Sequence, residues 1–268
     1  MGISRLILAV VGIGLTIALF VFGPTKEPIN SDENVLSEES IAETQISLDE
    51  LIAKKRNEIP DSLNNAIASL ESDFRASRSK IERLELLNRQ FELVHGRSEE
   101  WSALLYLQMA EIEETPIAWD NAGDQFAKTM FESKTPELKN FMANKALESY
   151  ENALVLAPDS TSYKLKKASV YLDGMNKVMD GVQILLQIVE NEPLNIDANL
   201  ILGRYGLISG QIQKAISRFE LVLEADDRNS EAYFYLGEAY QQAGDVEAAV
   251  RNFENCKKLV DEPGFHKE

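Results

Sequence analysis

Apolar residues recur through most of the chain at intervals of three and four positions, the spacing of a helix with one buried side. No stretch alternates between apolar and polar residues as a half-buried strand does. The helical pattern becomes continuous at a capping box, Ser47-x-x-Glu50, and holds to about Val260. The chain is therefore predicted to be all-α over this range, with no β-sheet.

Pro60 ends the first short helix, and Asp61 begins a stretch that contains neither glycine nor proline before Gly96. Its apolar residues recur on average every 3.5 positions, and polar residues occupy two of the positions where this period expects an apolar one. Two interpretations stay open: a coiled-coil dimer through residues 61–95, or two helices, broken near Arg75–Ser79, that pack on the rest of the fold. Additional leucines widen the apolar stripe beyond a narrow seam, which favours the packed pair.

The C-terminal part of the chain repeats itself with a period of 34 residues. The sets that recur at this interval are Leu202-Gly203, Gly210, Ala215 and Phe219, then Leu236-Gly237, Gly244, Ala249 and Phe253. Two looser copies precede them, the first with about eleven extra residues around Phe131–Phe141 and the second with one extra residue within Asp173–Val178. Internal repetition of this length indicates a stack of similar helical units.

Four repeats are predicted in residues 116–261. Their approximate bounds are 116–160, 161–195, 196–229 and 230–263. Residues 47–115 are predicted to form additional helices, and a degenerate fifth repeat from about Glu82 is left open. Residues 264–268 are a short C-terminal tail.

The signature residues have packing roles. Gly203 and Gly237 let the two helices of a unit approach closely, and Gly210 and Gly244 form the tight turn between them. The pattern Leu-Gly-x-x-Tyr, Gly, Ala, Phe and Pro at this period resembles the tetratricopeptide repeat (TPR), a helix–turn–helix unit. The resemblance implies a superhelix with a concave groove, lined by the first helix of each unit (helix A), that binds peptides or partner proteins.

The resemblance also implies which residues line the groove, because in TPR proteins the exposed side of each helix A faces it. The predicted protein-binding groove is made of Asp120, Asp124, Leu200, Arg204, Phe234, Glu238 and Gln241. Its most distinctive feature is Arg204 between the apolar Leu200 and Phe234. For each residue taken singly, an ordinary solvated helix face is the alternative. The family's clamp for the C-terminal carboxylate of chaperone tails requires Lys and Asn, so the two aspartates disfavour that ligand.

The N-terminus, residues 1–23, is predicted to be a transmembrane anchor. Its residues 6–23 are 18 residues without charge and with one polar side chain, Thr16, and as a helix they would span roughly 27 Å, about the hydrocarbon thickness of a bilayer. A cleaved secretory signal is the alternative. Arg5 before this segment and acid after it predict a single-pass inner-membrane protein with the bulk of the chain on the periplasmic side. Residues 24–46 are predicted to be an acidic flexible linker.

The composition and the absence of known catalytic motifs argue against several classes of function. A net charge of −17 disfavours binding to nucleic acid, and a single cysteine, Cys256, excludes an intramolecular disulfide. The two histidines, His95 and His266, are isolated, and no phosphate loop, nucleophile elbow or zinc motif occurs. The sequence therefore predicts a protein that is not an enzyme and that holds no cofactor or metal.

In layout the chain is similar to membrane-anchored bacterial TPR proteins of the cell envelope. The favoured function is a non-enzymatic scaffold or adaptor of an envelope complex, which binds protein or peptide partners through the concave groove. One alternative is a structural protein that self-associates as a homodimer through residues 61–95. Another is a receptor, facing the cytosol, for precursor or chaperone complexes.

Overall fold

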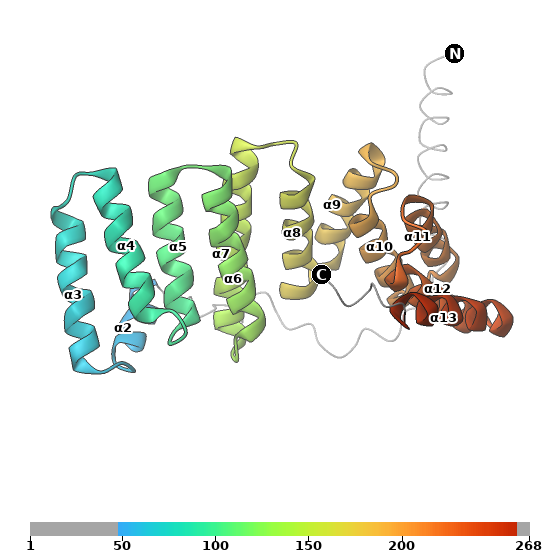
Figure 1. Cartoon of the computed structure of the whole chain (residues 1–268), viewed down its shortest axis with the longest axis horizontal. Helices are drawn as coiled ribbons and strands as arrows, with labels where there is room; N and C mark the ends of the chain where they lie inside the picture. The colour runs from blue at the N-terminus through green and yellow to red at the C-terminus, as the bar shows by residue number, and fades with distance from the viewer. Residues whose placement is uncertain (1–47, 262–268) are drawn as a thin grey trace, which may run out of the picture. The chain divides into compact units, whose positions relative to one another are not determined.

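The computed structural model describes residues 48–261, and every regular element in that range is helical (Figure 1). The α-helices are α2 (Leu48–Arg56), α3 (Asp61–Ala76), α4 (Lys80–Val94), α5 (Glu99–Glu113), α6 (Pro116–Glu132), α7 (Pro136–Leu156), α8 (Thr161–Ser169), α9 (Val178–Asn191), α10 (Ile196–Ile208), α11 (Ile212–Ala225), α12 (Ser230–Ala243) and α13 (Val246–Asp261). A π-helical turn, η2 (Val170–Gly174), continues α8. The described residues contain no strand, which confirms the predicted all-α fold.

The predicted membrane localisation is overturned. Across residues 48–261, no helix has both the length and the apolar composition to cross a bilayer. The longest, α7, has 21 residues but includes charged ones such as Glu137, Lys139 and Lys145, which are costly to place in hydrocarbon. The predicted anchor, linker and tail lie outside the described residues. The expectation of a single-pass inner-membrane protein with a periplasmic bulk is therefore corrected.

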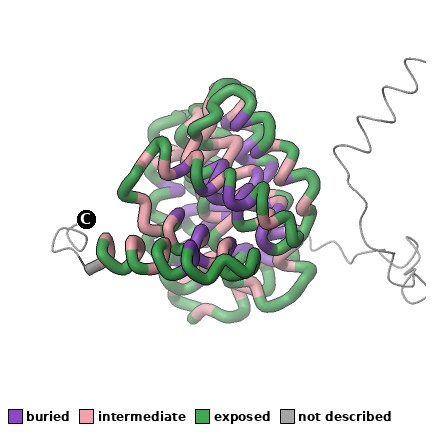
Figure 2. The backbone as a smooth tube through the Cα atoms, turned by 90° about the vertical axis from the view of Figure 1, so that its right-hand side faces the viewer, coloured by how far each residue is buried: buried purple, intermediate pink, exposed green. Residues whose placement is uncertain are grey.

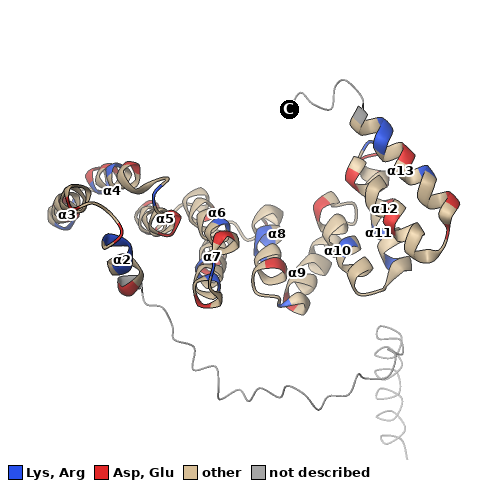
Figure 3. Ribbon diagram, turned by 90° about the horizontal axis from the view of Figure 1, so that it is seen from below, with Lys and Arg blue, Asp and Glu red and all other residues tan. Residues whose placement is uncertain are grey.

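Each helix packs mainly on its neighbours in sequence, so the compact unit of residues 45–268 is a row of helices as far as it is described (Figure 3). The four predicted repeats correspond to the pairs α6–α7, α8–α9, α10–α11 and α12–α13. Buried residues lie on the inside of the stack and exposed residues on its outside (Figure 2). Neighbouring pairs share their core, as expected of a stacked repeat.

The stretch before the repeats forms two helices, α3 and α4, broken at 77–79. Ile67 of α3 and Leu87 of α4 are fully buried in a cluster with Trp101 and Leu105 of α5. These residues would have to form the interface of a coiled-coil dimer, but they are already packed in the core of their own chain. The structure therefore has the packed pair of helices in place of a continuous coiled coil.

The signature glycine of helix A faces an aromatic ring of the second helix, helix B, in the same repeat. A Cβ atom added at Gly123, Gly203 or Gly237 would lie 2.4, 2.4 or 2.5 Å from a ring atom of Tyr150, Phe219 or Phe253, respectively. Atoms cannot approach so closely, so only glycine lets the ring rest on the helix A backbone.

The eleven extra residues of repeat one lengthen both of its helices. α6 has 17 residues and α7 has 21, whereas α10 and α11 have 13 and 14. The connection between α6 and α7 is only 133–135, and Thr135 caps α7 by accepting a hydrogen bond from the Leu138 amide. The insertion therefore makes a longer helical hairpin and no large loop.

The single extra residue of repeat two is accommodated by η2. The Met175 amide donates to the Val170 carbonyl at 3.0 Å, the i to i+5 bond of a π-turn, which adds one residue to a helix without breaking it. Asn176 then takes a left-handed conformation with φ of 54°. Gly210 and Gly244 hold the equivalent place in repeats three and four, with φ of 73° and 84°.

Candidate protein-binding face

The first helices of the four repeats, α6, α8, α10 and α12, carry the predicted groove. Side chains from these helices contact one another across the repeat boundaries, although the residues involved lie far apart in sequence. We call the exposed side of these four helices the helix A face.

At the N-terminal end of the helix A face, two of the predicted residues, Asp120 and Asp124, form an ion-pair network with Lys166. The Lys166 ammonium of α8 lies 2.6 Å from Asp120 Oδ1 and 2.8 Å from Asp124 Oδ2. The Tyr150 hydroxyl donates to Asp124 Oδ1 at 2.9 Å. Lys166 was missed by the sequence reasoning, although it directly follows Leu165, the position of repeat two that corresponds to Asp120 in repeat one. The two aspartates are therefore matched to a cation of their own chain.

This network shifts the pKa values of its neutral and cationic members. Burial lowers the pKa of Lys166, but its hydrogen bonds to Asp120 and Asp124 outweigh burial and raise that pKa above its usual value. Burial, and then the negative charge of Asp124, raise the pKa of the Tyr150 hydroxyl. Lys166 stays charged and Tyr150 stays protonated at neutral pH, so the network is a fixed structural contact.

At the middle of the face, Arg204 of α10 is exposed, and its guanidinium carbon lies 5.6 Å from the centre of the Tyr235 ring of α12. The Tyr205 hydroxyl donates to Asp173 Oδ1 of η2 at 3.0 Å. Burial, with this hydrogen bond, raises the pKa of Tyr205 to about 12. Successive repeats are thus joined by side chains on this side of the stack.

Leu200 differs from its prediction as an exposed groove residue. Only 7% of its surface is exposed, and it belongs to a core cluster with Ala232 and Leu236 of α12. The next helix A covers this position of the repeat, so Leu200 is a packing residue.

The last three predicted groove residues lie in α12, the helix A of the final described repeat. Phe234 is 42% exposed, with its ring centre 5.4 Å from Tyr235 and 5.9 Å from Phe253. Glu238 is half-buried and Gln241 is exposed. Phe234 stands one period after Leu200, so it is at the position that a following repeat would cover. The structure does not gather the seven predicted residues into one cluster.

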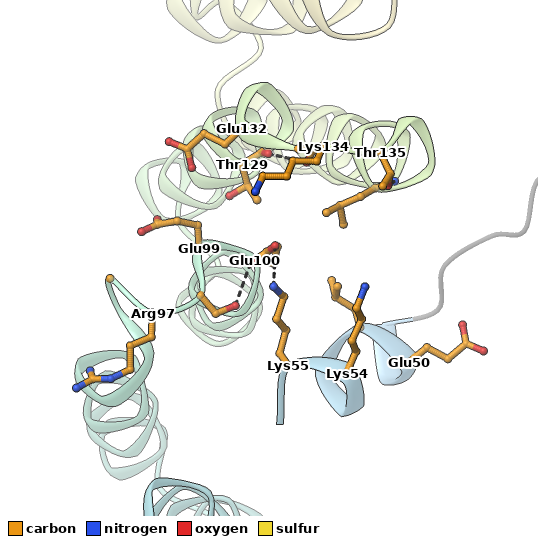
Figure 4. A pocket seen from close by; sticks show the side chains of 15 residues that line it. Glu50, Lys54, Lys55, Arg97, Glu99, Glu100, Thr129, Glu132, Lys134 and Thr135 are labelled. Atoms are coloured by element: carbon orange, nitrogen blue, oxygen red, sulfur yellow. Dashed lines mark hydrogen bonds and ion pairs between the residues drawn. The ribbon is translucent and has the colours of Figure 1, made fainter. Parts of the chain in front are cut away.

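A pocket of about 670 Å³ lies elsewhere, between α2, the start of α5 and the hairpin of repeat one (Figure 4). The extra residues of that hairpin form one wall, including Lys134 and Thr135. On the opposite side Lys55 of α2 reaches Glu100 of α5, 3.1 Å away. Its lining carries both signs of charge, and the Ser98 and Thr135 hydroxyls already cap the two helices that begin there. Sequence reasoning located the insertion but not this pocket, because α2 reaches it only through folding.

The described residues hold no group of three or more His, Cys, Asp or Glu side chains placed to bind a metal ion. Within the same range, every deeply buried side-chain polar atom has a hydrogen-bond partner. Asn199 is an example, because it donates to the Pro193 and Asn195 carbonyls at 2.8 Å and accepts from Arg218 at 3.0 Å. Its role is to join the start of α10 to α11.

Comparisons with known proteins agree with the fold, a stack of paired helices. A family model described as tetratricopeptide repeat matches residues 207–251. The structure of MamA, residues 41 to the end, from Desulfovibrio magneticus RS-1 is 17% identical, with a TM-score of 0.51 over 66% of this chain and 94% of that one. A crystal structure of MamA protein is 16% identical, with a TM-score of 0.50 over 69% of this chain and 96% of that one. At these identities the likeness concerns the fold. No curated protein matches the sequence.

Proposed function

Because the chain belongs to the tetratricopeptide repeat superfamily, we propose that it is a non-enzymatic interaction protein that binds a protein partner along the helix A face. The partner spans several repeats, with α10 at the centre of the contact. Arg204 is the residue we expect to contribute most to binding, because it combines exposure with a planar donor group.

The continuity of the helix A face supports this proposal. Lys166 joins α8 to α6 through both aspartates, and Arg204 of α10 lies over Tyr235 of α12. These contacts fix the spacing of successive helices before a partner arrives. A partner then binds a surface that is already ordered, so less conformational entropy is lost on association.

The ion-pair network limits what the N-terminal end of the face can bind. Asp120 and Asp124 share the single Lys166 ammonium, which compensates one of their two negative charges. A partner therefore meets a partly compensated acidic pair at α6 and an exposed cation at Arg204. We infer that the partner places a carboxylate or a backbone carbonyl at Arg204.

A matched pair of variants tests the proposed function. Arg204 and Lys214 are both exposed cations of repeat three, the first on helix A and the second on helix B. A photo-crosslinking residue at position 204 should capture another protein in cells, whereas the same residue at position 214 should not. Arg204→Ala should also remove the partner from affinity-purified complexes, and Lys214→Ala should leave it.

The melting temperature of both variants should stay close to that of the parent chain, because an exposed cation–π contact is worth only about 0.5–1 kcal/mol. Capture from position 214 alone, or an unchanged complex with a folded Arg204→Ala variant, would show that the helix A face is not the binding surface.

A further inference from the structure

The two ends of the described helix stack differ in chemistry. The first long helix, α3, has Ser62, Asn65 and Ser69 on its exposed side, and none of its large apolar residues is exposed. At the other end, Val246 is 69% exposed and Val250 is 49% exposed, both on α13. Figure 2 looks onto this end, with α13 across the front. Stacked repeats usually carry a polar outer surface on the terminal unit, and here only α3 does.

The repeat period explains why this end is apolar. Position for position, Phe234, Val250 and Phe253 stand 34 residues after Leu200, Ile216 and Phe219. Those earlier residues are 7%, 6% and 0% exposed, because α12 covers them. The end of the stack is therefore a complete repeat interface to which no next repeat is added among the described residues.

The residue types of that interface are largely retained. The pairs that remain apolar one period later are Leu200 and Phe234, Ile212 and Val246, Ile216 and Val250, Phe219 and Phe253, and Val222 and Cys256. Two positions become polar, Leu207 to Gln241 and Leu223 to Lys257. We call Phe234, Val246, Val250 and Phe253 the C-terminal face. An apolar centre with a polar edge is the usual make-up of a protein–protein interface.

We propose that the C-terminal face binds the same face of a second copy of this chain and so forms a twofold dimer. Contact with the α3 end of another copy would give an open chain of molecules, but α3 exposes none of its large apolar residues to match the C-terminal face. A second copy offers a surface of the same apolar character in its own C-terminal face, where Phe234, Val246 and Val250 are all exposed. A contact between identical surfaces closes on itself as a dimer.

The charges of α13 favour this partner. The chain carries a net charge of −17, so two copies repel over most of their surfaces. The sequence of α13 holds three acids and three bases: Glu247, Glu254 and Asp261 against Arg251, Lys257 and Lys258. This helix is therefore neutral, so a second copy that docks on α13 meets less repulsion there than the net charge of the whole chain would give.

The order of these residues indicates an antiparallel contact between the two α13 helices. With the symmetry axis between Val250 and Phe253, Val250 packs on Phe253 of the second copy. Glu247 near the start of the helix then lies close to Lys257 of the second copy, and symmetry repeats this pair. In a parallel contact each charged residue would instead lie beside the identical residue of the second copy, where like charges repel.

The size of the face suits a weak to moderate dimer. α13 has 16 residues, which corresponds to a length of about 24 Å, and two adjacent helices are about 20 Å wide. The footprint is therefore about 480 Å² per copy, or about 960 Å² in total, which is below the size of standard stable interfaces and typical of weak or transient ones. We expect a dissociation constant in the micromolar range.

Sedimentation of the full chain across the micromolar range tests the proposal. The parent chain should change from monomer to dimer as its concentration rises. Val250→Asp should raise the dissociation constant at least about tenfold, because a carboxylate from each copy would lose water at the symmetry axis. Val155→Asp is the matched control, since Val155 is 76% exposed on α7, away from this face, and it should leave the dimer unchanged.

A charge exchange tests the antiparallel geometry. Lys257→Glu should weaken the dimer by bringing two carboxylates together, and adding Glu247→Lys should restore it. Circular dichroism and thermal melting should show that every variant keeps the parent fold, because positions 247, 250 and 257 are exposed.

Three results would overturn the proposal. The first is a parent chain that stays monomeric across the range, and the second is equal self-association of the parent and Val250→Asp. The third is a chain ending at Asp261 that dimerises more tightly than the full chain, because residues 262–268 would then be the segment that covers the face.

Discussion

Three aromatic rings, those of Tyr150, Phe219 and Phe253, rest on helix A backbones where a side chain is missing. The sequence identified Gly203 and Gly237 as points of close approach but did not show which side chain approaches them. In the structure the Phe219 ring covers Gly203 and also stacks on Tyr235, with ring centres 5.5 Å apart. The 34-residue period shows that a residue recurs but not which neighbour it contacts.

Gly237→Ala should lower the free energy of unfolding by about 1–3 kcal/mol, because the new Cβ would displace the Phe253 ring. Phe253→Leu in the same chain should recover part of that loss by making room for the Cβ. Chemical denaturation of the two single variants and the double variant measures the coupling. Strictly additive effects would mean that the glycine and the ring do not constrain each other.

Leu200 and Phe234 hold the same position of the repeat in different surroundings. Leu200→Ala should destabilise the fold by about 2–4 kcal/mol, since it would leave a cavity between α10 and α12. Phe234→Ala should cost less than about 1 kcal/mol at concentrations where the chain is monomeric. Urea denaturation compares the pair directly, and equal losses would contradict the different burial of the two residues.

The predicted groove stays a prediction as a binding site, but the exposure of its residues can be compared with the structure. Arg204 is exposed as expected, whereas Leu200, which was also expected to be exposed, is buried. Sequence alone could not separate them, because burial of that position depends on how closely the next helix A approaches. The Lys166 network was also hidden, since it joins residues 46 and 42 positions apart.

At the level of elements, the termini of the helices were the most readable feature. The sequence contains a signal that would have resolved the hairpin of repeat one: Thr135-Pro136 is a capping residue followed by proline in the first turn, as is Thr115-Pro116 at the start of α6. Helix starts of this kind are local and can be read directly. The position of α2 could not be read, because Leu51 packs on residues far along the chain.

The attachment of α2 should depend on pH. Burial acts to raise the pKa of Glu100, but hydrogen bonds from its own backbone amide, from Lys55 and from Ser98 outweigh burial and hold that pKa below its usual value. The folded-state pKa is thus below the unfolded one. The resulting stability is present above the usual glutamate pKa, about 4.3, and is lost as pH falls through the folded-state pKa.

Glu100→Gln should therefore reduce the difference in melting temperature between neutral and acidic pH. Glu58→Gln is a suitable control, because Glu58 is exposed and pairs with the same lysine at 3.2 Å. Thermal melts at a series of pH values would measure the effect. The same acid dependence in the parent chain and Glu100→Gln would show that this pair does not attach α2.

At the scale of the whole described unit, stability should vary along the stack. Each interior repeat is held from two sides, whereas α12 and α13 have a neighbour on one side only. Native-state hydrogen exchange should therefore be fastest in α13 and slowest around α6 and α7, whose long helices share a large core. Uniform exchange across the repeats would instead indicate that the whole unit opens as one.

An apolar surface like that of α12 and α13 is also exposed while the chain is being synthesised. During synthesis each new repeat docks on the helix pair made just before it, so every growing intermediate ends in a surface of this kind. A ribosome that adds roughly 5–20 residues per second needs about 2–7 s to complete the next 34 residues. For those seconds each unfinished chain exposes a surface that fits its neighbours on the same messenger RNA. The described residues end in a surface of this kind, so any factor that shields nascent chains would find the same target at α12 and α13.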